Sequence, residues 1–161
     1  MASTKIAYGS VVGFTITLAS LADGSARQST PVDNSTNLFL DAQIQLLLKL
    51  ASGNIGTDQK INVYFFASMD GTNYDENVGA ADAGITIRAP SILRGPFSIF
   101  TPLEVGGATT YKAVIPSVAK YFDGVMPYKW GIIVENQTGL AFDVTEANHT
   151  KQYRGVYATG T

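Results

Sequence analysis

The sequence predicts an all-β protein, a jelly-roll-like β-sandwich of about eight to ten strands. Apolar and polar residues alternate along several segments, as they do in a strand that buries one face. Only 15% of the residues are charged and 16 are glycine, which is typical of a sheet protein with many turns. With 161 residues, 45% of them hydrophobic, we expect a flexible N-terminal arm over residues 1–10 and a single β-sandwich domain over residues 11–161.

The clearest long strand covers residues 37–49, which read NLFLDAQIQLLLK. Its even positions are all apolar and most of its odd positions are polar, so the even side chains are expected to face the core. A helix over these residues would mix polar and apolar side chains on one face, although the leucine-rich composition favours a helix. Phe39 and Leu47 interrupt the polar face; either they are ordinary exposed apolar residues, or something covers that face.

The neighbouring segments continue the same pattern. VVGFTITL at residues 11–18 alternates cleanly, and a polar connection follows over residues 19–36. KINVYFFAS at residues 60–68 resumes the alternation after a short loop that contains glycine. This loop predicts that residues 37–49 and 60–68 form an antiparallel hairpin in the centre of the sheet system.

Apolar residues also occupy the second face of the segment 60–68, at Tyr64 and Phe66. In an antiparallel pair, side chains of matching parity gather on one face of the sheet, here together with Phe39 and Leu47. Either the loops 19–36 or 89–107 cover this face, or a second subunit does; we prefer a subunit of a homotrimer. The interface candidates, including two apolar residues of the arm, are Ile6, Tyr8, Phe39, Leu47, Tyr64 and Phe66.

The second half of the chain predicts short strands separated by turns. In order, it contains an Asp-Gly turn at 68–74, a strand at 85–88, an edge strand within 89–107, a strand at 109–115, a helical turn at 117–122, a strand at 128–136, and a last strand at 151–159. The expected core residues are Phe14, Ile16, Leu38, Leu40, Ile44, Leu46, Val63, Phe65, Trp130, Ile132 and Val134.

Catalytic motifs are absent from the sequence. The single histidine, His149, lies in the polar stretch TEANHTKQY and is expected to be exposed on a loop, and there is no cysteine. Zinc or iron chemistry therefore has few ligands to use. No serine has a G-x-S-x-G context, and no dinucleotide-binding or phosphate-binding glycine motif occurs. We expect a protein that is not an enzyme and has no cofactor.

Two sets of carboxylates in the sequence could in principle serve a metal site or a hydrolase. Asp70, Asp75 and Glu76 in DGTNYDEN are closely spaced oxygen ligands, but they lack the order of an EF-hand, and Asp-Gly is explained by a turn. A glycosidase pair drawn from Asp70, Asp75, Glu104 or Asp123 needs a separation that no sequence feature defines. The sequence therefore predicts no metal site and no hydrolase.

The charge and hydropathy of the chain limit its partners. The formal net charge is −2 and there is no basic run, which argues against nucleic acid because phosphate binding needs a cationic surface. No segment has the length of a membrane span, so no membrane partner is expected.

Three passages resemble a known group of proteins: TITLASLADGSARQSTPVDNSTNLFLDAQIQLLLK, VYFFASMDGTNY, and MPYKWGIIVENQTGLAF followed by YRGVYAT. They are similar to small structural proteins encoded in the virion-gene regions of tailed bacteriophages, over most of the chain from Thr15 onward. The resemblance implies a capsid decoration (cement) protein, often trimeric, that binds the major capsid protein and bridges coat subunits. It also implies a place on the capsid surface of the virion after assembly in the host cytoplasm.

A second resemblance leads to an alternative function. VYFFASMDGTNY is similar to the S-x-D-G-x-x-aromatic hairpin of discoidin-like and carbohydrate-binding jelly rolls, with Tyr74 at the position that usually holds tryptophan. It implies a tail or baseplate component that binds a receptor or a carbohydrate. The same hairpin also forms wherever Ser and Asp-Gly stabilise a turn.

Overall fold

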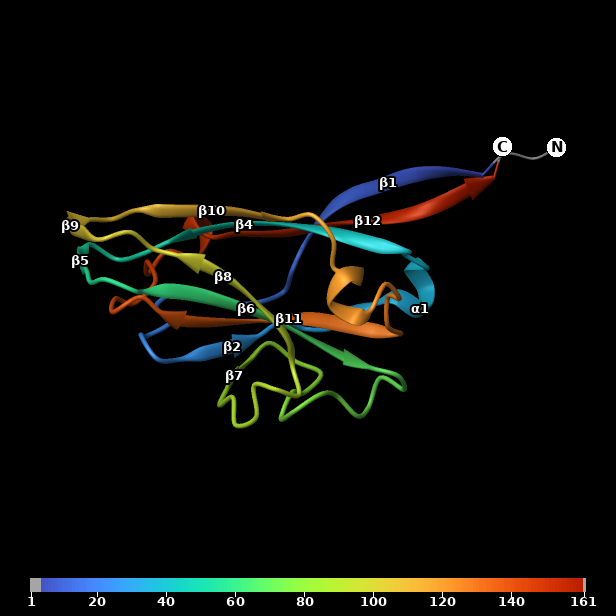
Figure 1. The fold of residues 1–161 in the computed structure, drawn as a ribbon, viewed down its shortest axis with the longest axis horizontal. Helices are drawn as coiled ribbons and strands as arrows, with labels where there is room; N and C mark the ends of the chain where they lie inside the picture. Colours follow the sequence, from blue (N-terminus) through green and yellow to red (C-terminus); the bar gives the residue numbers. More distant parts are fainter. Residues whose placement is uncertain (1–3, 161) are drawn as a thin grey trace.

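The computed structural model describes residues 4–160 and shows two antiparallel β-sheets that enclose one main core (Figure 1). The four-stranded sheet has the order β1 (Thr4–Gly13), β12 (Thr150–Gly160), β4 (Asp41–Lys49) and β10 (Thr110–Ile115). The six-stranded sheet has the order β7 (Ala83–Ile85), β2 (Ala26–Gln28), β11 (Lys129–Gln137), β6 (Lys60–Ser68) and β8 (Arg94–Phe100), and β3 (Val32–Asp33) also pairs with β11. The predicted all-β sandwich is confirmed.

The remaining elements are short. β5 (Gly53–Ile55) and β9 (Glu104–Gly107) form a small sheet at one end of the molecule (Figure 1). The helical turns are α1 (Asn34–Asn37), η1 (Ala119–Phe122) and η2 (Glu146–Asn148), and η1 falls where the sequence predicts a helical turn. The described residues thus contain twelve strands, above the expected range, and no helix long and apolar enough to cross a membrane.

The main core lies between the two sheets, where the alternation predicted it. Ala42, Ile44, Leu46 and Leu48 of β4 are fully buried. They belong to one cluster with residues of the opposite sheet and of the segment after β1, namely Phe14, Ile16, Val63, Phe65, Trp130, Ile132 and Val134. The period-two pattern therefore assigned the buried face of β4, β6 and β11 correctly, because successive side chains of a strand point to opposite faces.

Leu38 and Leu40 were predicted in the core, and this is wrong: 70% and 53% of their surfaces are exposed. The chain makes a helical turn before β4, and the carboxylate of Asp33 caps it by accepting the backbone N–H of Ser35 at 2.9 Å. Leu38 ends the turn with φ at 53°, so the extended backbone begins only at Asp41. The alternation of the sequence runs through a segment that is not a strand.

The predicted hairpin between residues 37–49 and 60–68 is also wrong. β4 pairs with β10 and β12, whereas β6 pairs with β11 and β8 in the other sheet. The connection between β4 and β6 contains β5, which pairs with β9 and carries the chain from one sheet to the other. The two apolar faces therefore meet across the core and not side by side in one sheet.

The outer face of the six-stranded sheet carries a second core. Tyr64 and Phe66 are 7% and 0% exposed, and they cluster with Ala26, Leu93 and Ile133. The long connection between β6 and β8 covers them with a set of half-buried side chains, Tyr74, Val78, Ile85 and Ile87. This connection lies below the sheet in Figure 1. The chain itself, mainly through residues 74–93, covers the face that we assigned to a second subunit.

The expectation of a flexible arm over residues 1–10 is wrong where the structure describes this segment. Residues 4–10 belong to β1, which pairs with β12 from Thr4 opposite Gly160 to Gly13 opposite Gln152. Residues 1–3 lie outside the described residues. The first and last described strands, β1 and β12, thus form one antiparallel pair.

Acid should destabilise this fold. The backbone N–H of Thr145 and the side chain of Asn148 donate to Asp143 and hold its pKa well below the usual range, and the N–H groups of Asn73 and Thr72 do the same for Asp70. A carboxylate with a lowered folded-state pKa stabilises the fold above its unfolded-state pKa of about 4, and this stability is lost as the pH falls. We expect the melting temperature to drop between about pH 5 and pH 2, and to drop less for Asp143→Asn. A melting temperature independent of pH over this range would contradict the prediction.

Candidate interaction surface

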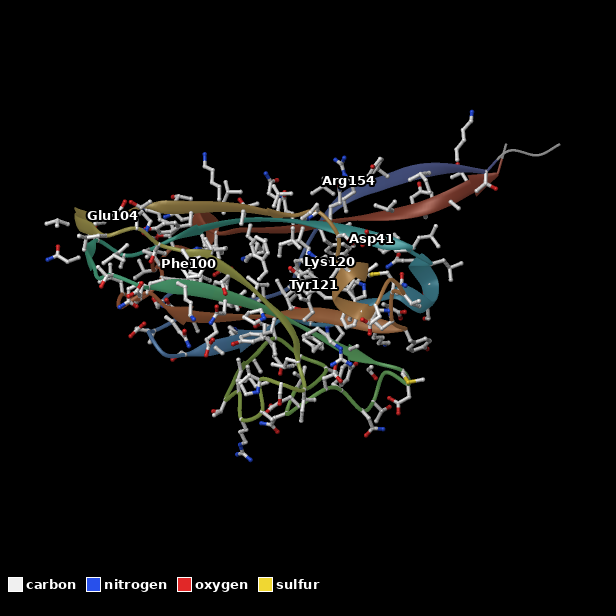
Figure 2. All side chains as sticks on the ribbon, in the orientation of Figure 1. Asp41, Phe100, Glu104, Lys120, Tyr121 and Arg154 are labelled. Carbon is white, nitrogen blue, oxygen red and sulfur yellow. The ribbon has the colours of Figure 1, made fainter. Side chains whose placement is uncertain are left out.

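The outer face of the four-stranded sheet is the counterpart of the covered face described above. Side chains of β4 that point away from the core are Gln43, Gln45 and Leu47, and they are half-buried or exposed. By register, Arg154, Gln152 and Thr150 of β12 lie beside them, and Val114 and Lys112 of β10 lie on the other side. Val114 is 59% exposed, and Figure 2 shows Arg154 on this outer side of the sheet. The face is a mixture of amide and aliphatic side chains with few charges.

This sheet extends beyond the sandwich as a two-stranded ribbon. β4 stops pairing with β12 at Asp41 opposite Val156, whereas β1 and β12 continue to pair as far as Thr4 opposite Gly160. Residues 4–8 and 156–160, here called the terminal ribbon, project away from the body in Figure 1. A two-stranded ribbon is marginally stable in water by itself, so the terminal ribbon has little support from its own chain.

Apolar side chains line one face of the terminal ribbon. Ile6 is 61% exposed and lies opposite Ala158, and Tyr8 is 57% exposed and lies opposite Val156. Lys5 is the one charged residue among residues 4–8 and 156–160. Exposed apolar residues that gather on an unsupported element are typical of a surface that contacts another protein.

The structure divides the six predicted interface residues into two groups. Ile6 and Tyr8 are exposed on the terminal ribbon, and Leu47 is half-buried on the open sheet face. The other three pack inside the chain, so their assignment to an exposed surface is wrong. Two of these are Tyr64 and Phe66 of the second core. The third is Phe39, which packs against the main core.

The ring of Phe39 packs against the backbone of Gly155. Its ring lies 6.4 Å from the ring of Tyr153 and occupies the space beside Gly155, where a Cβ atom would collide with it. Phe39 precedes β4 and lies on the core side of the sheet, because Gly155 has the same parity in β12 as the buried Tyr153. The sequence assigned Phe39 to the outer face because its position is odd. This assignment is wrong because β4 begins only at Asp41, so the alternation of the strand does not apply at residue 39.

His149 was predicted to be exposed on a loop, and this is wrong: it is 5% exposed. Its Nδ1 accepts the backbone N–H of Lys49 at 3.3 Å, and its Nε2 lies 3.1 Å from the carbonyl oxygen of Asp143. These contacts define the neutral tautomer with the proton on Nε2, and the ring packs beside Phe142. The polar sequence around His149 gives no signal of this burial. The histidine links the last turn before β12 to the end of β4.

The hairpin that resembles carbohydrate-binding modules is a closed turn. Asp70 accepts the backbone N–H groups of Thr72 and Asn73, each at 2.8 Å. The phenol of Tyr74 donates to the carbonyl oxygen of Gly71 at 3.0 Å, and its ring stacks edge-on against Phe66 at 6.0 Å. The aromatic residue of this hairpin thus faces the second core of its own chain.

The next two carboxylates of the sequence DGTNYDEN, Asp75 and Glu76, accept hydrogen bonds from different segments of the backbone. Asp75 accepts the backbone N–H of Ala67 at 2.9 Å. Glu76 accepts the N–H groups of Arg88 and Ala89. Within residues 4–160, no three histidine, aspartate or glutamate side chains come together as a metal site. Glu104 lies beyond the Lys60 end of β6 and Asp70 beyond its Ser68 end, about 30 Å apart at the rise of a strand, much too far for a glycosidase pair.

Calcium is therefore expected to leave this protein unchanged. The oxygens of Asp70 already accept hydrogen bonds from the backbone and from Asn73, so a cation would have to compete with them. We expect the same melting temperature in millimolar calcium and in EDTA. A higher melting temperature in calcium, abolished by Asp70→Asn, would establish the site that we reject.

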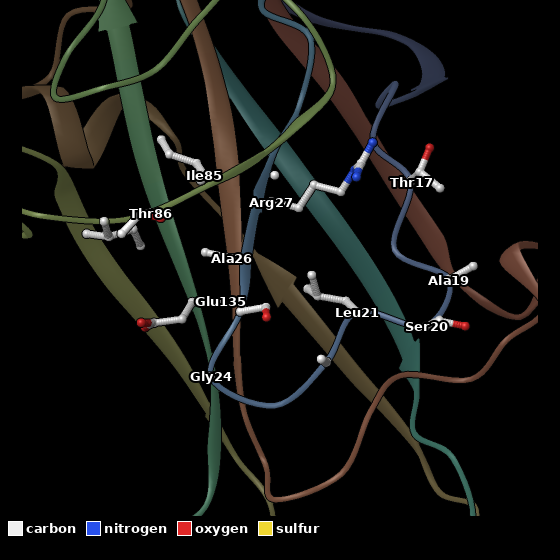
Figure 3. A pocket seen from close by; sticks show the side chains of 14 residues that line it. Thr17, Ala19, Ser20, Leu21, Gly24, Ala26, Arg27, Ile85, Thr86 and Glu135 are labelled. Atoms are coloured by element: carbon white, nitrogen blue, oxygen red, sulfur yellow. The ribbon is translucent and has the colours of Figure 1, made fainter.

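A polar groove of about 570 Å³ lies between residues 17–27 and residues 84–87, above β11 (Figure 3). Its two charged side chains point to opposite sides in Figure 3. Arg27 pairs with Asp82 at 2.5 Å, and Glu135 accepts from Asn62 at 2.9 Å. A ligand site needs polar groups that converge on one point. The two charged groups of this groove diverge and are already paired, so the groove does not have the arrangement of a ligand site.

Comparison of the chain with known protein families, with curated proteins and with solved structures finds no match.

Proposed function

We propose that this chain is a non-enzymatic structural protein of a tailed-phage virion, a capsid decoration protein that bridges coat subunits. The three passages that resemble phage virion proteins support this role. The geometry supports the proposal through the difference between the outer faces of the two sheets.

One observation carries the proposal. The outer face of the six-stranded sheet is packed by the chain's own loop around Phe66, whereas the outer face of the four-stranded sheet is open and continues into the terminal ribbon. Gln45, Leu47 and Val114 on the open face form an uncharged patch, and the cores of protein interfaces are depleted in charge. An open, weakly charged sheet face with an apolar extension suits attachment to a protein lattice.

The proposed partners are the major capsid protein and further copies of the chain, at the surface of the capsid. The argument for a trimer depended on Phe39, Tyr64 and Phe66, which pack inside the chain. The surface that remains for these contacts consists of the open sheet face and the terminal ribbon with Ile6 and Tyr8.

A binding assay with capsid shells tests the proposal. The purified protein is added to shells of the major capsid protein encoded in the same genome, and the bound fraction is measured by co-sedimentation. We expect saturable binding that weakens at least about tenfold, or 1.4 kcal/mol, when Gln45 and Val114 are both replaced by arginine. Met69→Arg is the control, because Met69 is 91% exposed in the turn after β6, a strand of the other sheet.

Two results would contradict the capsid role. One is a wild-type protein that does not bind the shells. The other is density for the protein on the tail in an electron-microscopy map of the intact particle. Binding to a glycan array together with tail density would establish the alternative, a tail or baseplate component that recognises a carbohydrate.

A further inference from the structure

We propose that β1 pairs edge to edge with β1 of a second copy around a two-fold axis at Ala7, so that two four-stranded sheets become one. This inference deepens the self-association within the proposed function. It concerns the purified protein alone, so it can fail while attachment to the capsid holds. Three observations support it: an open edge, a ribbon without support, and a self-complementary register.

The first observation is the open edge. β1 stands at the end of the four-stranded sheet and pairs only with β12, so among residues 4–160 no strand occupies its other edge. The backbone N–H and C=O groups along this edge are free to pair with another strand. Residues 4–8 run without a bulge, because the irregularity of β1 falls between Tyr8 and Val11. These residues contain no proline and only one lysine, so the usual protections of an edge strand are largely missing.

The second observation is the lack of support under the terminal ribbon. The two strands stand alone beyond Val156, and their apolar residues Ile6 and Tyr8 are more than half exposed. Two strands are marginal in water, whereas three or more with an apolar face are stable. A second copy would supply two further strands and give the order β12, β1, β1, β12 across the axis.

The third observation identifies the occupant as a second copy. When Ala7 lies opposite Ala7 of the second copy, Ile6 lies opposite Tyr8, and Lys5 lies opposite Gly9. The β-branched and aromatic pair is among the favourable cross-strand pairs, and the two lysines do not face each other. With the neighbours Ala158 and Val156 in β12, each Ile6–Tyr8 pair becomes the centre of a row of four apolar residues.

Other two-fold registers lose this match. A two-fold axis perpendicular to the sheet keeps outer side chains opposite outer side chains. The register can therefore change only in steps of two residues, which corresponds to moving the axis by one residue along β1. An axis at Ile6 would place Tyr8 opposite Thr4, and an axis at Tyr8 would place Ile6 opposite Ser10. Only the axis at Ala7 pairs both apolar residues of one strand with apolar residues of the other. Because only a few residues per strand take part, we expect a weak dimer, with a dissociation constant of about 10–100 μM.

Sedimentation equilibrium over a concentration series tests the pairing. The wild type should shift from monomer to dimer, and both Ile6→Lys and Tyr8→Asp should weaken the dimer at least about tenfold. The double variant should recover part of the affinity, because the two new side chains have opposite charges and face each other across the axis. Val105→Lys, at an 84% exposed position of β9 far from the ribbon, is the control and should dimerise like the wild type.

Disulfide cross-linking tests the register independently. The chain has no cysteine, so Ala7→Cys introduces the only thiol, and it should form a covalent dimer with oxidised glutathione. Lys5→Cys should cross-link much more slowly, because residue 5 faces residue 9 of the second copy. A wild type that stays monomeric at about 300 μM would overturn the inference, since that is well above the expected dissociation constant. A dimer insensitive to all the ribbon variants, or equal cross-linking at residues 5 and 7, would overturn it as well.

Discussion

Replacing Phe66 by alanine is expected to lower the free energy of unfolding by about 3–5 kcal/mol. The ring is fully buried on the outer side of the six-stranded sheet, and it lies so close to Gly131 that a Cβ atom there would collide with it. It also packs edge-on against Tyr74 at 6.0 Å. The substitution would leave a cavity between the sheet and the connection that covers it. Urea denaturation followed by circular dichroism measures the loss.

Phe100→Ala is the matched control for this prediction. Phe100 is also a phenylalanine of the six-stranded sheet, at the end of β8, but it is 70% exposed, and we expect a change within about 0.5 kcal/mol. The Phe66→Ala variant should also be cut faster by protease within residues 69–93, because this segment loses its main anchor. Equal stability of the two variants would show that the second core does not hold the connection to the sheet.

The second core explains why the six-stranded sheet is apolar on both faces. In a simple two-layer sandwich the outer face of each sheet is mostly polar. Here residues 69–93 add an incomplete third layer, through Tyr74, Val78, Ile85 and Ile87. The four-stranded sheet has no such layer within the described residues, and its outer face carries glutamines, threonine, a few aliphatic residues, Lys112 and Arg154 instead. The two outer faces therefore differ in what the chain itself packs against them.

Alternation along the chain predicts which side chains face a core, and it does so well for β4, β6 and β11. It contains no information about which sheet a strand joins, because Leu46 and Phe65 reach the same core from opposite sides. The loop between β4 and β6 is short enough for a hairpin, yet it passes from one sheet to the other through β5. Its partner β9 is about 50 residues away in the chain, which no local pattern reveals.

The interface residues illustrate the same limit. Tyr64 and Phe66 were correctly recognised as a second apolar face, but the sequence does not say whether a loop or a subunit covers it. Leu38 and Leu40 follow the parity of β4 and are nevertheless exposed, because the capped turn of α1 delays the strand. Ile6 and Tyr8 stand out as the sizeable apolar residues of a polar segment, and they remain on the surface.

Replacing His149 by alanine is expected to destabilise the protein by about 2–4 kcal/mol, although the sequence predicts an exposed loop residue. The substitution removes the acceptor for the N–H of Lys49 and the donor to the carbonyl oxygen of Asp143. Because His149 is only 5% exposed, water reaches these two backbone groups poorly, and it would not fully replace the hydrogen bonds that the ring makes. The side chain also leaves a gap next to the fully buried Phe142. Thermal and urea unfolding of the two proteins measure the difference.

A partial replacement separates the hydrogen bonds from the packing. His149→Gln keeps an amide N–H near the position of Nε2, so it should recover part of the stability that His149→Ala loses. Val144→Ala, at an exposed position of the same loop, should change the stability by no more than about 0.5 kcal/mol. If His149→Ala unfolded at the same urea concentration as the wild type, the ring would contribute no net stabilisation at the junction of β4 and β12. The exposed loop that the polar sequence predicts would then be the better description of this junction, since a solvated imidazole can be removed at little cost.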